Sequence, residues 1–200
     1  MKYINKMAEY ETRRFNKALI WDYFILVTRI LLAFTLLRYG WSKLIGGQFF
    51  VTEETLNLPL KQIDLLRVSW YLASHEPFNS FVGISQIVTA GLLIYKRTAM
   101  LGAFISIPIW ANILIWDMSF MGLYTGFTVR IPFYLLLTSL IIWHSKDKVI
   151  PVLQILLKRT STKFKFPIWA YLLVIPFGFL LELIGSIPIA IIHYIKQLLR

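Results

Sequence analysis

A run of apolar residues at positions 22–46 constrains this chain more than any other feature of its sequence. The run is long enough to cross a bilayer as a helix, because about 20 residues at a rise of 1.5 Å span a hydrocarbon core of roughly 30 Å. It nevertheless carries three cations, Arg29, Arg38 and Lys43. A charged side chain at the middle of a bilayer costs on the order of 3 kcal/mol on insertion scales. Each cation therefore needs a partner, water or a route to the interface.

Helical periodicity places the polar residues of this run on one wide face. At about 100° per residue, all three cations lie within about 100° of Thr28, as do Thr35 and Tyr39. The opposite face is apolar and consists of Phe34, Leu37, Trp41 and Leu44. We therefore expect one face of this helix to contact lipid and the other to face protein or a hydrated cavity.

The composition of the whole chain indicates the same environment. Hydrophobic residues make up 58% of the 200 residues and charged residues 16%, whereas charged residues make up about 25% of an ordinary soluble domain. The net charge of +11 comes from Lys and Arg residues that flank apolar runs, which is typical of cytoplasmic loops and of contact with anionic lipids. No nucleic-acid partner is expected. The absence of cysteine excludes disulfides and thiolate metal sites.

The spacing of the apolar runs predicts an all-α integral membrane protein, with a four-helix transmembrane bundle and a C-terminal fifth hydrophobic helix. The last helix contains several prolines and glycines, so it is either a kinked span or a re-entrant hairpin. The basic segments favour a cytoplasmic N-terminus. The predicted regions are a cytoplasmic amphipathic lead-in (1–21), the bundle (22–145), a basic cytoplasmic surface segment (146–166) and the fifth helix (167–200).

Polar residues inside the predicted spans are the candidates for a functional site, because ionisable groups in a bilayer must be paired or hydrated. We predict a polar pocket in the outer half of the bundle. Its ligand-binding residues are predicted to be Arg38, Tyr39, Lys43, Gln86 and Asn112. The candidates for ion pairs or proton transfer are Asp117, Arg130, Glu182 and Arg29. No catalytic or metal-ligating residue is predicted, since no nucleophile, phosphate-loop or metal-binding motif is found.

Several of these candidates also have a purely structural interpretation. Lys43 and Arg29 lie near the two interfaces, where long cationic side chains reach the lipid headgroups. Gln86 either forms an interhelical hydrogen bond or contacts a ligand. Arg38 lies deeper, about two thirds of the way across the span. It needs either a carboxylate, with Asp117 at the matching depth, or an anionic ligand.

The first span also carries a pattern of motif residues. An arginine early in the span is followed near its outer end by Gly-x-x-Lys and then by Gly and Phe, here Arg29, Gly40-Trp41-Ser42-Lys43, Gly46-Gly47 and Phe49. Together with the second span and its short basic turn, VGISQIVTAGLLIYKRTAMLGA, this pattern resembles the DoxX-like family over about residues 22–145. The resemblance implies a four-helix bundle in a bacterial or archaeal cytoplasmic membrane, with Arg29, Gly40 and Lys43 in the first-helix motif.

The resemblance also bears on function. Some members of the family resemble small subunits of quinone-linked oxidoreductases, and many have no assigned activity. This chain has Gln86 where members commonly carry glutamate, which puts an acid/base role at that position in doubt, and residues 146–200 lie beyond the family's four-helix unit.

Three functions follow as hypotheses. The first is a non-catalytic membrane subunit or binding module that holds a quinone or an anionic lipid in the polar pocket. The second is a small proton-coupled transporter that uses Glu182 and Asp117, although the inverted repeat common in carriers is not found. The third is an enzyme that modifies a lipid or quinone. No intrinsic cofactor is expected apart from a quinone. The expected partners are membrane lipids, a membrane or peripheral redox subunit, and a second copy of the chain.

Overall fold

Every regular element in the part of the chain that the structure describes is a helix, which confirms the all-α prediction. The structure is a computed structural model that describes residues 2–158 and 166–199. Its elements in chain order are α1 (Lys2–Leu44), α2 (Glu53–Leu56), the 3-10 helix η1 (Leu60–Gln62), α3 (Leu65–Ala73), α4 (Phe78–Ile94), α5 (Ala99–Phe120), α6 (Gly126–His144), α7 (Lys146–Leu157), α8 (Ile168–Leu172) and α9 (Val174–Leu198).

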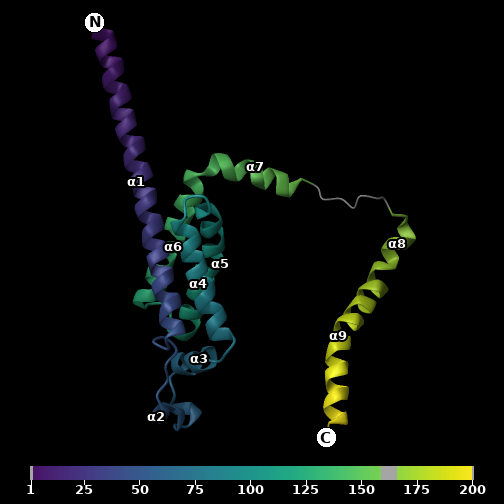
Figure 1. Cartoon of the computed structure of the whole chain (residues 1–200). Helices are drawn as coiled ribbons and strands as arrows, with labels where there is room; N and C mark the ends of the chain where they lie inside the picture. Colours follow the sequence, from purple (N-terminus) through teal and green to yellow (C-terminus); the bar gives the residue numbers. More distant parts are fainter. Residues whose placement is uncertain (1, 159–165, 200) are drawn as a thin grey trace. The chain divides into compact units, whose positions relative to one another are not determined.

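The chain separates into two compact units, Met1–Leu153 and Gln154–Arg200. The first unit contains α1 to α6 and most of α7, and the second contains α8 and α9. Helix α1 runs from Lys2 to Leu44 without interruption, so the predicted lead-in and the first span form one continuous helix. The first turns of α1 extend beyond the ends of α4, α5 and α6 (Figure 1).

Four helices of the first unit pack into a closed bundle (Figure 1). Helix α1 packs against α4 and α6, and α5 packs against the same two helices from the other side. The contact between α1 and α4 is the most extensive of the four. These two helices run antiparallel, because residues near the C-terminal end of α1 contact residues near the N-terminal end of α4. The site described below lies at this interface.

The interior and exterior of the bundle differ in character from those of a soluble helical protein. Large apolar side chains such as Phe34, Ile115 and Leu136 point outward and are exposed, while Thr89, Ser106 and Thr138 are buried between the helices. Exposed apolar surface on this scale indicates a partner other than water. The arrangement agrees with the polar and apolar faces predicted for residues 22–46.

Three segments are long and apolar enough to cross a membrane, namely Lys17–Leu44, Ala99–Phe120 and Gly126–His144. Helix α4 has 17 residues and reaches this standard only together with α3, from which it is bent by 84°. The described residues therefore contain three candidate spans, or four if α3 and α4 form one broken span. In the second unit, Val174–Gly185 is a shorter apolar helical segment.

Candidate functional site

Two glycines bring α1 and α4 together at the centre of the site. A Cβ atom built on Gly40 would lie 2.5 Å from the carbonyl oxygen of Gly83, and one built on Gly83 would lie 2.8 Å from Leu44 Cδ2. Only glycine allows the two backbones to approach this closely, as at other small-residue helix contacts. The close approach allows a side chain from the last turn of α1 to reach into α4.

That side chain is Lys43, which is 4% exposed. Its Nζ atom donates a hydrogen bond to Gln86 Oε1 of α4 at 3.2 Å, to Gln48 Oε1 at 2.8 Å and, at the limit of 3.5 Å, to the Tyr39 carbonyl oxygen. The same atom lies 5.7 Å from the centre of the Tyr39 ring and 5.3 Å from that of Phe49, within cation–π range. All of these acceptors are electrically neutral.

A short loop after α1 encloses the ammonium group. Gly46 has a φ of 71°, which turns the chain back toward the helix, and the Gln48 N–H donates to the Ser42 carbonyl oxygen at 3.0 Å. This turn brings the Gln48 amide onto Lys43 and buries Phe49 to 9% exposure. Asn79, in the first turn of α4, donates to the Lys43 carbonyl oxygen at 3.2 Å, and its buried Oδ1 has no hydrogen-bond partner among the described residues.

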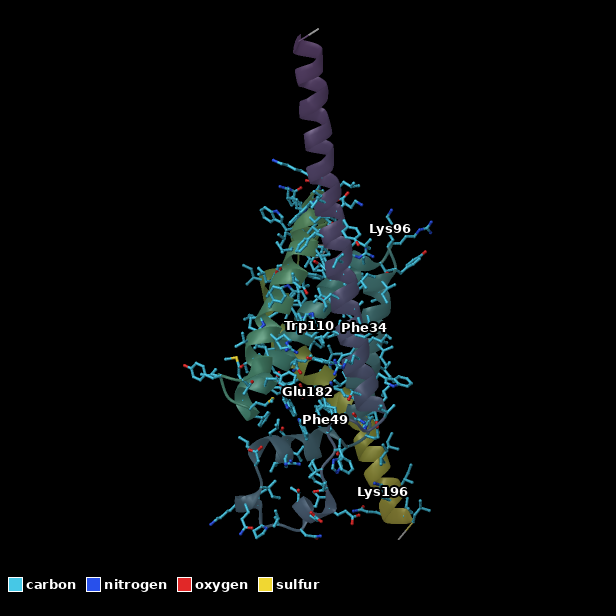
Figure 2. The ribbon with its side chains drawn as sticks, turned by 90° about the vertical axis from the view of Figure 1, so that its left-hand side faces the viewer. Phe34, Phe49, Lys96, Trp110, Glu182 and Lys196 are labelled. Atoms are coloured by element: carbon cyan, nitrogen blue, oxygen red, sulfur yellow. The ribbon has the colours of Figure 1, made fainter. Side chains whose placement is uncertain are left out.

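An aromatic cluster continues from Lys43 into the bundle. The Tyr39 ring contacts Trp110 edge to face, with 6.3 Å between ring centres, and Trp110 packs against Tyr134 at 5.0 Å. Trp110 is fully buried, and its Nε1–H finds no acceptor among the described residues. Along the bundle, Trp110 lies between Phe49 near one end and Lys96 at the other (Figure 2).

Charged residues surround this cluster without contacting one another. The charges of Arg38, Arg130 and Asp117 all act on Tyr39, and Asp117 also acts on Lys43. Within the described ranges, no carboxylate lies within ion-pair distance of Lys43, Arg38 or Arg130. Lys43 is therefore buried without a contacting carboxylate among the described residues, although the charge of Asp117 reaches it.

The structure divides the predicted ligand-binding residues into two groups. Tyr39, Lys43 and Gln86 meet at the α1–α4 interface. Arg38 and Asn112 are exposed at the surface of the bundle. The ion pair considered between Arg38 and Asp117 is not formed among the described residues. Helical periodicity allows Arg38 to face either the interior or the exterior, and packing against α4 turns Tyr39 and Lys43 inward instead.

Three further candidates lie on α5, α6 and α9. Arg130 is exposed and lines a shallow hollow of about 670 Å³ beside the start of α6. Glu182 is exposed on α9, in the second unit. Asp117 is half-buried on α5. Among residues 2–158 and 166–199, no three His, Asp or Glu side chains lie close enough together to hold a metal ion.

Arg29 binds the opposite end of α4. Its Nε and Nη2 atoms donate to the Leu93 carbonyl oxygen at 3.1 and 2.9 Å, and Nη2 also donates to the Ile94 carbonyl oxygen at 3.1 Å. These carbonyl groups belong to the last turn of α4, which has no intrahelical donors for them. Arg29 therefore caps a helix through its Nε and Nη2 groups.

Sequence reasoning did not single out Gln48 or Asn79, although both contact Lys43. The Gly46-Gly47 pair was the available signal, because it predicts a tight turn that returns the following residues to the helix end. Phe49 was noted only as part of a motif. Its place over the Lys43 ammonium depends on the backbone path of this turn, which residue spacing does not reveal.

Comparisons with known proteins assign no activity to this chain. The chain is similar to a Bacillus subtilis (strain 168) protein described as uncharacterized protein YwoB, with 34% identity over 88 residues. The match covers 44% of this chain and 56% of that relative. No protein-family model matches the chain. No solved structure matches it.

Proposed function

We propose that this chain is a DoxX-like multi-pass membrane protein that acts as a non-catalytic subunit or binding module. In this proposal the α1–α4 site holds a lipophilic molecule with polar oxygens, either a quinone or an anionic lipid. The protein would lie in the bacterial cytoplasmic membrane and associate with a membrane or peripheral redox subunit. Its bundle would span the membrane four times, with α3 and α4 as one broken span, and α9 would supply the fifth hydrophobic helix.

The distribution of charge supports this membrane arrangement. The basic turn with Lys96 and Arg97 lies at the end of the bundle from which α1 extends, whereas α2 and α3 lie at the other end (Figures 1 and 2). That other end carries carboxylates such as Glu53 and Glu54. Positive residues collect on the cytoplasmic side of membrane proteins, so this distribution favours a cytoplasmic N-terminus.

One observation carries the proposed binding function, namely the buried Lys43 ammonium with only neutral acceptors in contact. Burying a charge is costly unless an opposite charge or several strong hydrogen bonds compensate for it. The Asp117 carboxylate acts on Lys43 only from beyond ion-pair distance. An anionic ligand oxygen that accepts from Lys43 would supply the opposite charge that the amides lack, and a quinone oxygen would supply a further neutral acceptor.

The surroundings of Lys43 favour a ligand that is partly apolar. The rings of Tyr39 and Phe49 border the ammonium, and the outward faces of α1 and α4 are apolar. A headgroup oxygen could contact Lys43 while the remainder of the molecule lies against these apolar surfaces. Trp110 Nε1 and Asn79 Oδ1 are buried polar atoms without partners among the described residues, so the site retains unused hydrogen-bonding capacity.

The test is native mass spectrometry of the protein purified from membranes in a mild detergent. We expect wild-type protein to retain a co-purified quinone or anionic lipid. Lys43→Met keeps a side chain of similar length and removes the charge, so the retained fraction should fall at least tenfold. Lys96→Met is the matched control, because Lys96 is an exposed cation outside the site and its replacement should leave the retained fraction unchanged.

Two results would count against the proposal. One is wild-type protein that carries neither a quinone nor a lipid after mild extraction. The other is equal retention by Lys43→Met and wild type. The transporter hypothesis, with Asp117 and Glu182 as its two carboxylates, ranks second, because the inverted repeat common in carriers is not found in the sequence. A self-contained enzyme ranks third.

A further inference from the structure

The two amide groups that contact the Lys43 ammonium are held in very different ways. Gln86 is 1% exposed and lies in the middle of α4, where the Gly40–Gly83 contact fixes the neighbouring backbone. Gln48 is half-buried and lies in the short loop that follows α1, between the exposed residues Gly47 and Phe50. The Gln48 contact is the shorter of the two, at 2.8 Å against 3.2 Å. Gln86 is therefore an acceptor within the bundle, whereas Gln48 is an acceptor that the loop places over the Lys43 ammonium.

The backbone that carries Gln48 is strained at the next residue. Phe49 has a φ of 67°, in the left-handed region that bulky side chains rarely adopt. Such a conformation persists only where surrounding contacts hold it in place. Here those contacts are the Gln48 hydrogen bonds to Lys43 and Ser42 and the packing of the Phe49 ring over the ammonium. Releasing Gln48 would also release this strain.

We propose that residues 46–49 form an exchangeable cap, in which the Gln48 amide oxygen occupies the position that an anionic oxygen of the ligand takes at Lys43. Ligand binding would replace the Gln48 contact and displace the cap, while Gln86 remains in place as the fixed acceptor. This inference rests on the proposed function, since it assigns the ligand class and the regulation of the same site.

The replacing group is an anionic oxygen, of a phosphate or a carboxylate, for an electrostatic reason. An ionised acceptor adds a direct Coulomb attraction to the ammonium that a neutral amide lacks. Lys43 has no carboxylate at contact distance among the described residues. An anionic headgroup can therefore compete with the Gln48 amide, whereas a neutral quinone carbonyl would exchange one neutral acceptor for another. Of the two ligands proposed above, this favours the anionic lipid.

The first experiment tests the cap without any ligand. Full-length protein in detergent is treated with an amine-acylating reagent, and modification of Lys43 is followed by peptide mass spectrometry. Gln48→Ala should raise the rate of Lys43 acylation several-fold, because the covering contact is lost. Gln62→Ala is the matched control, since Gln62 is an exposed glutamine of the neighbouring η1 helix. An unchanged rate in Gln48→Ala would overturn the cap.

The second experiment tests the exchange with two probes, phosphatidylglycerol and oleate, which carry a phosphate and a carboxylate. Native mass spectrometry would compare their binding to wild-type protein, Gln48→Ala and Gln48→Glu. We expect Gln48→Ala to bind the preferred probe several-fold more tightly, because no internal group competes for Lys43. Gln48→Glu should bind it at least tenfold more weakly, because a carboxylate would then occupy the ligand position.

The outcomes separate the exchange from the underlying binding function. Weaker binding in Gln48→Ala would overturn the exchange, because Gln48 would then be a ligand contact or a structural support. A third outcome is that neither variant binds either probe, while Lys43 is acylated faster in Gln48→Ala. This outcome would reject the anionic ligand and support the cap. A quinone retained by wild type and unaffected by either Gln48 variant would also reject the exchange, and the proposed function would stand.

Discussion

The two ends of the α1–α4 interface place a cation in two different situations. At one end, the Arg29 guanidinium donates three hydrogen bonds to carbonyl oxygens at the C-terminal end of α4. Nearer the other end, the Lys43 ammonium contacts two side-chain amides, Gln86 in the middle of α4 and Gln48 in the loop after α1. Both cations come from the same helix, and both fall in the same motif. Arg29 donates to the exposed carbonyl groups of a helix end, whereas Lys43 donates mainly to side-chain amides.

The difference follows from the direction of α4. A helix carries partial negative charge at its C-terminal end and partial positive charge at its N-terminal end. Arg29 therefore meets carbonyl groups and a favourable dipole, whereas the Lys43 ammonium contacts the middle of α4 and gains only from the C-terminal end of its own helix. Arg29 is suited to a structural role, and in our proposal Lys43 exchanges one of its neutral acceptors for a ligand oxygen.

The largest expected effect comes from forcing α1 and α4 apart, because this would break the contacts of both Arg29 and Lys43 with α4. In Gly40→Val, the new Cβ would lie 2.5 Å from the Gly83 carbonyl oxygen. We expect a loss of about 3 kcal/mol of stability, at the upper end of overpacking costs, together with loss of lipid retention. Thermal unfolding in detergent and native mass spectrometry would measure the two effects.

A matched glycine on α4 provides the control for that substitution. Gly91 has no atoms within 4 Å of its built Cβ position. Gly91→Ala should leave retention unchanged and keep or slightly raise the unfolding temperature, since alanine favours helix by up to about 1 kcal/mol over glycine. Equal losses in Gly40→Val and Gly91→Ala would show that the close approach of α1 and α4 is not what holds the site together.

Removing the structural cation should have the next largest effect on stability. Arg29→Met leaves the Leu93 and Ile94 carbonyl groups without their donor. We expect a loss of about 2–3 kcal/mol, the range for a hydrogen-bonded charged group and for the acceptors it leaves unpaired. Lipid retention at temperatures well below unfolding should stay close to wild type. A specific loss of retention without loss of stability would reverse the roles assigned to the two cations.

Removing Lys43, the cation that we propose binds the ligand, should affect retention more than stability. Lys43→Met removes the desolvation cost of a buried charge, but it also leaves the Gln48 and Gln86 amide oxygens without their donor, which costs about 1–3 kcal/mol. Because these two effects oppose each other, the unfolding temperature should change less than in Arg29→Met, while retention of the anionic lipid falls at least tenfold. A large drop in unfolding temperature would instead assign Lys43 a structural role like that of Arg29.

The smallest effects are expected at the exposed members of the predicted site. Arg38→Gln and Asn112→Ala change residues that lie at the surface of the bundle, and exposed substitutions usually alter stability little. Arg38→Gln should weaken lipid retention less than Lys43→Met, because Arg38 acts on the site only through its charge. If Arg38→Gln lost as much lipid retention as Lys43→Met, this would indicate that the ligand binds at the outer surface of α1.

Much of the fold and part of the site could be read from residue patterns. The lengths of the apolar runs predicted the candidate spans, although α4 proved short and depends on α3 to reach a full crossing. The polar face of residues 22–46 correctly brought Tyr39 and Lys43 inward, and Gln86 meets Lys43 there. Contact with the lipid headgroups did not explain Arg38 at its depth in the span, so a carboxylate or a ligand was expected as its partner. In the structure Arg38 is exposed at the surface of the bundle. Its angle on the helix was known, but the position of α4 around that helix was not.

The sequence by itself determined the helical class, the apolar exterior and the set of polar residues available to the interior, because these follow from local periodicity and side-chain chemistry. Only the tertiary structure decided how the cations of α1 are used. Arg29 caps a helix whose C-terminal carbonyls lie 64 and 65 residues further along the chain. The contacts of Lys43 depend on a glycine crossing and on a left-handed turn at residues 46–49. Such contacts join residues that are remote in sequence, so no spacing within one helix can specify them.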